Sequence, residues 1–138
     1  MRAFLFYLLS FTWGLPITAA GFICAVFVRL CGVRSDRVGY CRRFRVGRGW
    51  GGFSLGPFVF VGEDEPESTA WHEHGHGIQN CFFGPLMIFL VSIPSAVRYW
   101  YRRLNENKRF RHAYGDIWFE AQATRLGKKQ RGRIGRDK

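Results

Sequence analysis

The fold is organised around one short stretch of the chain, residues 71–79, which reads Trp71-His72-Glu73-His74-Gly75-His76-Gly77-Ile78-Gln79. On a helix, residues four apart lie one turn above each other on the same face. His72 and His76 can therefore offer two imidazoles to one metal ion. Glu73 comes next in sequence, where it can reach a water on that ion and act as a general base without being a ligand. The alternative is a surface helix that carries two histidines by chance.

The composition combines strong basicity with many aromatic residues. The 138 residues carry a net charge of +11, and 47% of them are hydrophobic and 17% aromatic. This balance suggests a negatively charged partner, either nucleic acid or the anionic headgroups of membrane lipid. Because the apolar residues come in blocks, membrane lipid is the favoured partner and nucleic acid the less favoured one. The four cysteines show no Cys-x-x-Cys spacing, and we expect them to be reduced.

The first apolar block predicts an N-terminal membrane anchor at residues 1–31. No charged residue occurs from Ala3 to Val28, and a helix of that length exceeds the roughly 30 Å hydrocarbon core of a bilayer. The Gly14-Leu15-Pro16 step could instead kink this helix or split it into a hairpin. A cleaved signal peptide competes with the anchor, but the apolar run continues beyond the small residues Thr18-Ala19-Ala20. The arginines between Arg29 and Arg48 then indicate the cytoplasmic side.

Residues 53–61 are rich in strand-forming residues and precede the histidine motif. Pro57 cannot donate a hydrogen bond to a strand ladder, so we expect a short edge strand or hairpin here. Phe53, Ser54 and Leu55 are the candidate edge, since an exposed edge lets an extended peptide pair with the backbone. A hairpin with a purely structural role is the alternative.

A second apolar segment predicts a re-entrant or interfacial element at residues 81–101. The chain is uncharged from Cys81 to Val97, but Pro85 and Pro94 interrupt it. Aromatic and basic residues then follow at 98–103, as at a membrane interface. A full crossing would separate the later part of the chain from the two histidines and place one basic segment outside. We therefore expect the chain to dip in and return, or to lie along the surface.

The last part of the chain predicts a helix and a tail. A helix is expected from Phe110 to Leu126, with Gly127 as its C-cap. Residues 128–138 are Lys, Arg and Gly with almost nothing apolar. They predict a basic disordered tail.

A catalytic zinc needs a third protein ligand and an open coordination position. Glu120 is the favoured third ligand, because it lies in a predicted helix whose small residues permit close packing. Asp116, one turn earlier, is the second choice or a hydrogen-bond partner for a ligating histidine. His74 points away from the ligand face and is interpreted as structural or as another such partner. Gly75 and Gly77 are expected to let the helix pack closely.

Several blocks of this sequence together resemble a group of short bacterial membrane metallopeptidases. They are Ser54-Leu55-Gly56, His72-Glu73-x-Gly75-His76 with Gln79, Gly84-Pro85-Leu86, Ile93-Pro94-Ser95 and Glu120-x-x-Ala123-x-x-Leu126-Gly127. The resemblance covers residues 52–127. It extends to the gluzincins, in which a glutamate on a later helix completes the zinc site. The layout is similar to that of integral-membrane zinc endopeptidases with Glu-x-x-Ala-Asp at this point, where Thr124 replaces the Asp.

The resemblance and the motif together imply a membrane-anchored, zinc-dependent metallopeptidase that acts on a peptide or protein substrate. His72, His76 and Glu120 would bind the zinc, and Glu73 would activate a water for attack on the peptide carbonyl. His112 and Tyr114 are candidate donors to the oxyanion. The alternatives are a non-enzymatic membrane protein with a structural or regulatory zinc site, and a basic nucleic-acid-associated protein.

The expected fold class is α+β, a mostly helical membrane-associated minimal zincin. Its expected parts are the anchor at residues 1–31, a zincin-like metal-binding domain at 32–127 and the tail at 128–138. The protein is expected at a membrane, with the metal site on the cytoplasmic side.

Overall fold

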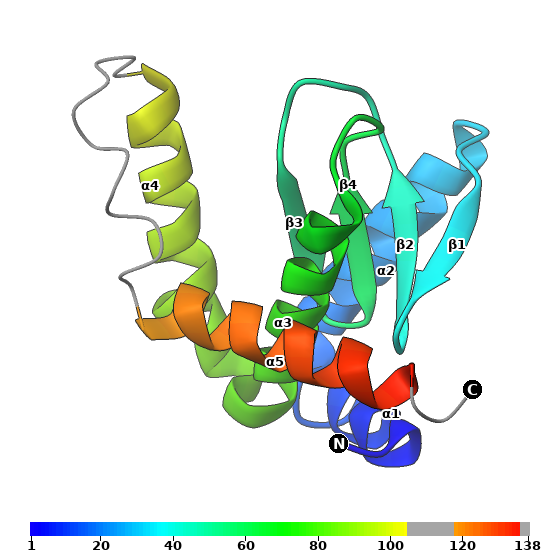
Figure 1. Cartoon of the computed structure of the whole chain (residues 1–138), viewed down its shortest axis with the longest axis vertical. Coiled ribbons are helices and arrows are strands. Elements are labelled where there is room, and N and C mark those ends of the chain that lie inside the picture. Colours follow the sequence, from blue (N-terminus) through cyan, green and yellow to red (C-terminus); the bar gives the residue numbers. More distant parts are fainter. Residues whose placement is uncertain (105–117, 136–138) are drawn as a thin grey trace.

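The computed structural model describes residues 1–104 and 118–135, and it has an α+β fold (Figure 1). The helices are α1 (Ala3–Phe11), α2 (Leu15–Leu30), α3 (Glu67–Phe83), α4 (Ile93–Leu104) and α5 (Trp118–Ile134). The strands are β1 (Ser35–Val38), β2 (Cys41–Arg45), β3 (Gly52–Leu55) and β4 (Phe58–Val61). A 3-10 turn, η1 (Gly84–Leu86), and a π-helical turn, η2 (Ile88–Ser92), connect α3 to α4.

The four strands form one sheet in the order β1-β2-β4-β3. Strands β3 and β4 pair in antiparallel fashion around a turn at Gly56 and Pro57, where Gly56 has a φ of +62°. The prediction of a hairpin before the histidine motif is therefore confirmed, and β3 lies at an edge of the sheet. Parallel pairing of β2 with β4 joins this hairpin to a second one.

The second hairpin, β1–β2, was not predicted. Its residues belong to the arginine-rich stretch that the sequence analysis interprets as a membrane-flanking segment. The turn between the strands contains Gly39 with a φ of +58°, a conformation that favours glycine. A Cβ at Gly39 would also lie 2.1 Å from Nε2 of His74 on α3. The turn is thus fixed both by its backbone conformation and by the helix that packs against it.

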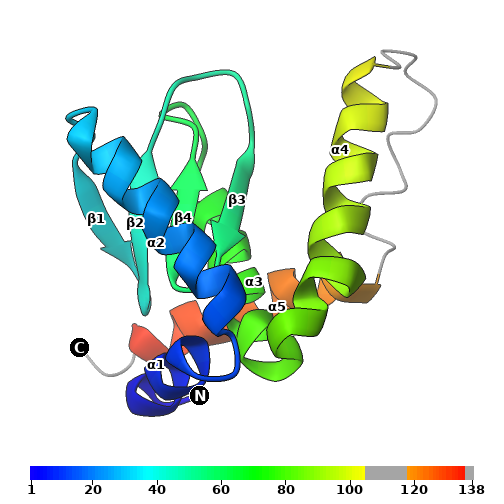
Figure 2. The ribbon, with the colours of Figure 1, turned by 180° about the vertical axis from the view of Figure 1, so that it is seen from behind.

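Helices cover both faces of the sheet. Figures 1 and 2 show α3 on one face and α2 on the other, with α5 packed on the outer side of α3. Successive side chains of a strand point to opposite faces of the sheet, as expected for a pleated sheet. Phe44 and Phe60 lie in the cluster beneath α2, whereas Val59 and Val61 lie in the cluster that includes Ala70 and Ile78 of α3.

The first apolar block forms two helices, α1 and α2, that meet at 94°. The structure has the predicted kink near Gly14, and residues 3–30 do not form one continuous helix. The break is stabilised locally, since Thr18 Oγ1 donates to the carbonyl of Ser10 at 2.8 Å. Phe6 and Ile17 are buried against the rest of the protein. Residues 1–31 therefore pack together with the chain that follows them.

Within residues 1–104 and 118–135, no single helix has both the length and the apolar character needed to cross a membrane. Two bent pairs meet the requirement only when their helices are taken together. One pair is α1 with α2, and the other joins residues 67–86 to residues 88–97 at 118°.

The end of helix α5 corrects the predicted boundary at Gly127. The helix continues to Ile134, so residues 128–134 are ordered helix and not a disordered tail. Gly127 is required by packing, because a Cβ there would lie 2.0 Å from the carbonyl oxygen of Trp71 on α3. The residues beyond it are mostly Lys, Arg and Gln, which are good helix formers.

Candidate metal centre

Helices α3 and α5 approach closely at small residues, and this contact assembles the site. A Cβ on Gly75 would lie 1.9 Å from the carbonyl oxygen of Ala123. The predicted role of Gly75 in close packing is therefore confirmed, and Gly77 has a similar role against the Gly56 carbonyl, at 2.9 Å. The contact brings Glu120 on α5 over the face of α3 that carries His72 and His76.

Three side chains, His72, His76 and Glu120, form a group that could hold a metal ion. The Nε2 atoms of the two histidines lie 3.2 Å apart. Oε2 of Glu120 lies 3.0 Å from Nε2 of His72 and 3.3 Å from Nε2 of His76. The prediction that these three residues come together is confirmed.

The spacing of the three donor atoms suits an ion of the size of zinc. Zinc lies about 2.0–2.1 Å from nitrogen and carboxylate ligands, and tetrahedral angles then separate neighbouring ligands by about 3.3–3.4 Å. The three observed separations, 3.0, 3.2 and 3.3 Å, are close to that value. Two imidazoles and one carboxylate are also a donor set found in catalytic zinc sites.

Gln79 determines which ring nitrogen of His76 carries a proton. The side-chain nitrogen of Gln79 donates to the carbonyl of Phe119 at 2.7 Å and to Oε1 of Gln122 at 2.8 Å. Because the Phe119 carbonyl can only accept, the amide oxygen of Gln79 faces Nδ1 of His76, at 2.8 Å. Nδ1 of His76 therefore carries a proton and donates, and Nε2 is the atom available to a metal.

Thr124 holds the other histidine. Its hydroxyl oxygen lies 2.9 Å from Nδ1 of His72. A hydrogen bond to this outer ring nitrogen fixes the orientation of the imidazole. His72 therefore has a partner on α5.

Ser95 at the start of α4 donates a hydrogen bond to Oε1 of Glu120. The other carboxylate oxygen, Oε2, faces the two histidines. Glu120 is thus held from one side by a hydroxyl and left with one oxygen for a cation. The contact also ties α4 to the metal centre.

The pKa values show a site that attracts positive charge. Burial favours the protonated form of Glu120, but hydrogen bonds from the two histidines and Ser95 hold its pKa well below the ordinary value. Burial alone would lower the pKa of His76, but the carboxylates of Glu120 and Glu73 raise it. Burial raises the pKa of Glu73 itself.

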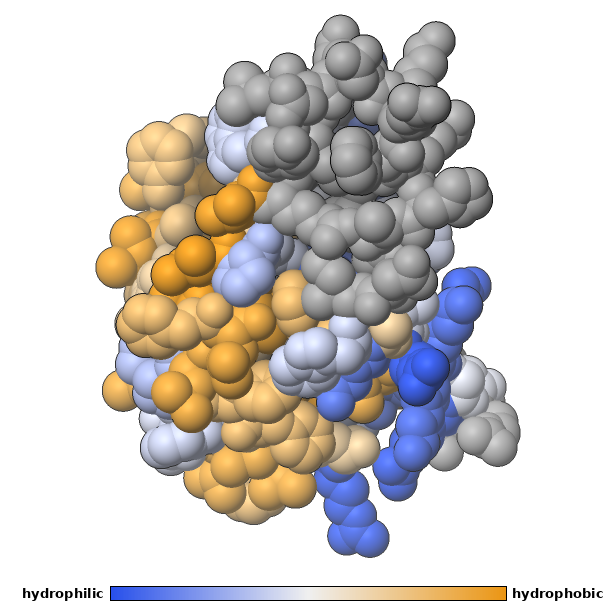
Figure 3. Space-filling view, turned by 90° about the vertical axis from the view of Figure 1, so that its left-hand side faces the viewer, coloured by the Kyte–Doolittle hydropathy of each residue, from blue (hydrophilic) through white to orange (hydrophobic). Residues whose placement is uncertain are grey.

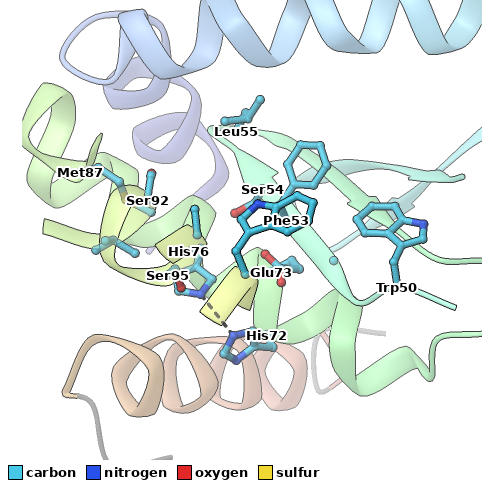
Figure 4. A pocket seen from close by; sticks show the side chains of 14 residues that line it. Trp50, Phe53, Ser54, Leu55, His72, Glu73, His76, Met87, Ser92 and Ser95 are labelled. Atoms are coloured by element: carbon cyan, nitrogen blue, oxygen red, sulfur yellow. Dashed lines mark hydrogen bonds between the residues drawn. The ribbon is translucent and has the colours of Figure 1, made fainter. Parts of the chain in front are cut away.

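A cavity of about 560 Å³ opens beside the triad formed by His72, His76 and Glu120. Its wall includes His72, Glu73 and His76 of α3, the whole of β3 and part of the η2–α4 segment. Figure 4 shows the two histidines directed toward one another with Glu73 beside them. Glu73 is only 6% exposed, and Gly52 permits β3 to approach it, since a Cβ there would lie 3.1 Å from Cγ of Glu73.

His74 is directed away from the triad. It is fully buried, accepts a hydrogen bond from the backbone N–H of Tyr40 at 3.3 Å and stacks on Trp71. Its Nδ1 lies 3.9 Å from Sγ of Cys41. These contacts agree with the structural role predicted for His74, and among the described residues it has no hydrogen bond to His72, His76 or Glu120. The reason is that its neighbours come from the β1–β2 turn, which the sequence analysis missed.

Three further predicted residues, His112, Tyr114 and Asp116, lie outside the described residues. All four cysteines are free thiols, as expected. Three hydrogen-bond partners of the ligands were not assigned a role from the sequence, namely Gln79, Ser95 and Thr124. For Gln79 a signal existed, because it lies three positions after His76 and so on an adjacent part of the same helix face.

Comparisons with models of protein families, with curated protein sequences and with solved structures gave no match. The resemblance to membrane zinc metallopeptidases therefore stays a prediction from the motifs.

Proposed function

We propose that the protein is a membrane-associated, zinc-dependent metallopeptidase that hydrolyses peptide bonds. One observation carries the proposal: His72, His76, the Glu73 side chain and the edge strand β3 line one cavity, and Glu120 completes a group of three donors with the two histidines. Structural zinc sites are closed by four protein ligands, whereas catalytic sites keep three and an open position. The cavity beside three donors favours the catalytic alternative over a structural or regulatory zinc site.

Each residue of the site has its own role in the proposed hydrolysis. His72, His76 and Glu120 would hold the zinc, which when bound polarises the peptide carbonyl and lowers the pKa of water to about 7. Glu73 takes one proton from the attacking water as a new C–O bond forms at the carbonyl carbon. It then gives that proton to the leaving nitrogen as the C–N bond breaks, which yields an amine and a carboxylic acid. The acid ionises and releases the second proton of the water to solvent.

The geometry of β3 supports an extended peptide as the substrate. Gly52, Phe53, Ser54 and Leu55 all line the cavity. Because successive side chains of a strand point to opposite faces, a wall made of consecutive residues is the edge of the strand. Strand β3 pairs with β4 on its other side, so its second edge is where a peptide backbone would pair.

Exposed apolar residues support the membrane association. Large side chains such as Phe4, Phe22, Phe27 and Leu30 on α1 and α2 are 57–82% exposed. Figure 3 shows apolar side chains gathered over one half of the side it presents, and hydrophilic side chains at its lower right. Exposed arginines that follow α2, such as Arg34 and Arg37, favour the cytoplasmic side of the membrane for the metal site.

Hydrolysis of a quenched fluorescent peptide by the zinc-loaded protein in lipid nanodiscs tests the proposal. We expect Glu73→Gln to keep its zinc and to lose activity by about a hundredfold or more, because the proton acceptor is gone. Glu63→Gln is the matched control, since among the described residues the Glu63 carboxylate pairs with exposed Arg48 on the surface. Equal activity in the two variants, or no zinc-dependent hydrolysis of any peptide, would contradict the proposal.

A further inference from the structure

We propose that the cavity beside the triad selects a peptide segment with a large apolar side chain next to the scissile bond. The inference rests on the proposed peptidase function and adds its substrate class. It is drawn from the walls of the cavity outside the motif helix.

The cavity walls beyond α3 are mostly apolar. Trp50, Phe53 and Leu55 lie on the sheet side, and Met87, Val91 and Trp100 lie on the η2–α4 side. Figure 4 shows this arrangement for Trp50, Phe53, Leu55 and Met87. Among the described residues that line the cavity, Glu73 carries the only acidic side chain, and there is no Lys or Arg.

This composition discriminates between substrate side chains. A volume of about 560 Å³ lies in the range of roughly 300–1,000 Å³ typical of ligand pockets, so it accommodates an aromatic side chain together with the peptide backbone. Removing an apolar side chain of this size from water favours binding by about ten- to a hundredfold. A charged side chain would lose its water without gaining a partner from the apolar walls.

The aromatic rings of the sheet wall pack against one another. The ring of Phe53 stacks on Phe60 with centroids 4.9 Å apart and contacts Trp50 at 5.7 Å. Phe53 is nevertheless 43% exposed, so it lies at the rim of the cavity and does not belong to the buried core. These properties make Phe53 the residue whose removal changes selectivity with the least effect on folding.

The cavity wall formed by the η2–α4 segment is apolar on the side that faces the cavity and on its outer side. Met87 and Val91 face inward and are buried, whereas Phe89 and Leu90 between them are exposed on the outside. The apolar segment that the cavity accepts could therefore come from an unfolded soluble chain or from a lipid-inserted one. The chemistry of recognition is the same for both sources.

Peptide binding to the zinc-loaded Glu73→Gln protein in nanodiscs tests the inference. The probes are short fluorescein-labelled peptides that differ only at one central position, which is Phe, Leu, Gly, Asp or Lys. Fluorescence anisotropy is measured and binding to empty nanodiscs subtracted. We expect the Phe and Leu peptides to bind about tenfold or more tightly than the other three.

Two further substitutions test which part of the cavity wall causes the preference for apolar peptides. Adding Phe53→Ala should reduce the preference by about tenfold, because part of the apolar wall is lost. Adding Phe89→Ala, on the outside of the opposite wall, should leave it unchanged. Equal affinities for all five peptides, tighter binding of the Asp or Lys peptide, or no binding of any would overturn the inference.

Hydrolysis by the wild-type protein is scored separately, which distinguishes the two proposals. Selective binding without hydrolysis supports the apolar ligand class and contradicts the peptidase, whereas hydrolysis without selectivity contradicts only this inference. The Phe sequence is also offered free in solution and fused to a transmembrane helix in vesicles of phosphatidylcholine and phosphatidylglycerol. Preference for the apolar peptide in either setting supports the apolar substrate class. The setting in which hydrolysis is faster identifies whether the segment comes from solution or from the membrane.

Discussion

The hydroxyl oxygen of Thr124 on α5 lies 2.9 Å from Nδ1 of His72 on α3, although the two residues are 52 positions apart in sequence. The contact orients, from outside the triad, one of the two imidazoles that could bind a metal ion. Removing such a partner typically lowers metal affinity by about 10- to 100-fold. We expect Thr124→Val, which keeps the shape and removes the hydroxyl, to weaken zinc binding by that amount.

Zinc affinity of this variant is measured by competition with a fluorescent chelator. Thr69→Val is the matched control, because the Thr69 hydroxyl bonds Glu65 at the start of α3. If Thr124→Val and Thr69→Val bind zinc equally well, Thr124 does not support the ligand.

Ser95→Ala tests the second contact that holds the ligands. Without its hydroxyl donor, Oε1 of Glu120 is free to turn toward the ion, so the carboxylate loses its fixed orientation. We expect zinc affinity to fall by about tenfold and the visible spectrum of the cobalt-substituted protein to change. Ser92→Ala, which alters the same cavity wall one turn earlier, should change neither. An unaltered cobalt spectrum in Ser95→Ala would contradict the assignment.

Gly75→Ala tests the close contact between α3 and α5. Its Cβ would meet the Ala123 carbonyl at 1.9 Å, and backbone cannot move aside as a flexible side chain can. We expect a loss of about 1–3 kcal/mol or more in the free energy of unfolding, together with loss of the metal site. In contrast, a Cβ on Gly132 of α5 would have no atom of the described residues within 4 Å, so Gly132→Ala should stabilise the helix by up to about 1 kcal/mol. Thermal unfolding that ranks the two variants the other way would refute this account of the packing.

Arg43 connects the unpredicted hairpin to the motif helix. Its side chain is buried and forms ion pairs with Asp36 of β1 and Glu67 of α3. Because both carboxylates are about half exposed, the expected cost of Arg43→Met is about 1–3 kcal/mol, less than for a fully buried pair. Arg42→Met, which changes an exposed arginine of the same strand, is the control. Urea unfolding at neutral pH measures both.

The same ion pair gives a pH dependence of known sign. The hydrogen bonds from Arg43 hold the pKa of Asp36 below its ordinary value. Its contribution to stability is therefore present above about pH 3.9, the value in an unfolded chain, and is lost as the pH falls through the lower folded value. This part of the acid sensitivity should be absent from Arg43→Met. If wild type and variant lose stability in parallel below pH 4, the pair does not contribute.

The features predicted from the sequence are those with local signals. The helical spacing of His72 and His76 predicts a shared face, and Pro57 predicts the edge hairpin. The small residues that follow Glu120 favour it as the third ligand, and Ala123 indeed lies against Gly75. Each of these arguments uses residues within one or two helical turns or one strand.

The features that were missed depend on distant partners. The arginines of β2 indicate a membrane-flanking segment unless Asp36 and Glu67 are known to pair with Arg43. Similarly, Gly127 indicates a helix end unless the Trp71 carbonyl is known to lie against it. A sequence pattern alone does not report such neighbours, and the β1–β2 hairpin and the true end of α5 could not be predicted for that reason.

The metal content of the purified protein tests the central claim most directly. Elemental analysis after purification without chelator should find about one zinc per chain, and much less in His76→Ala and Glu120→Gln. Glu63→Gln should retain the wild-type amount, since it changes a surface carboxylate in the same way. A wild-type protein that is folded but binds no zinc, even when zinc is added, would contradict the metal centre and with it the proposed peptidase.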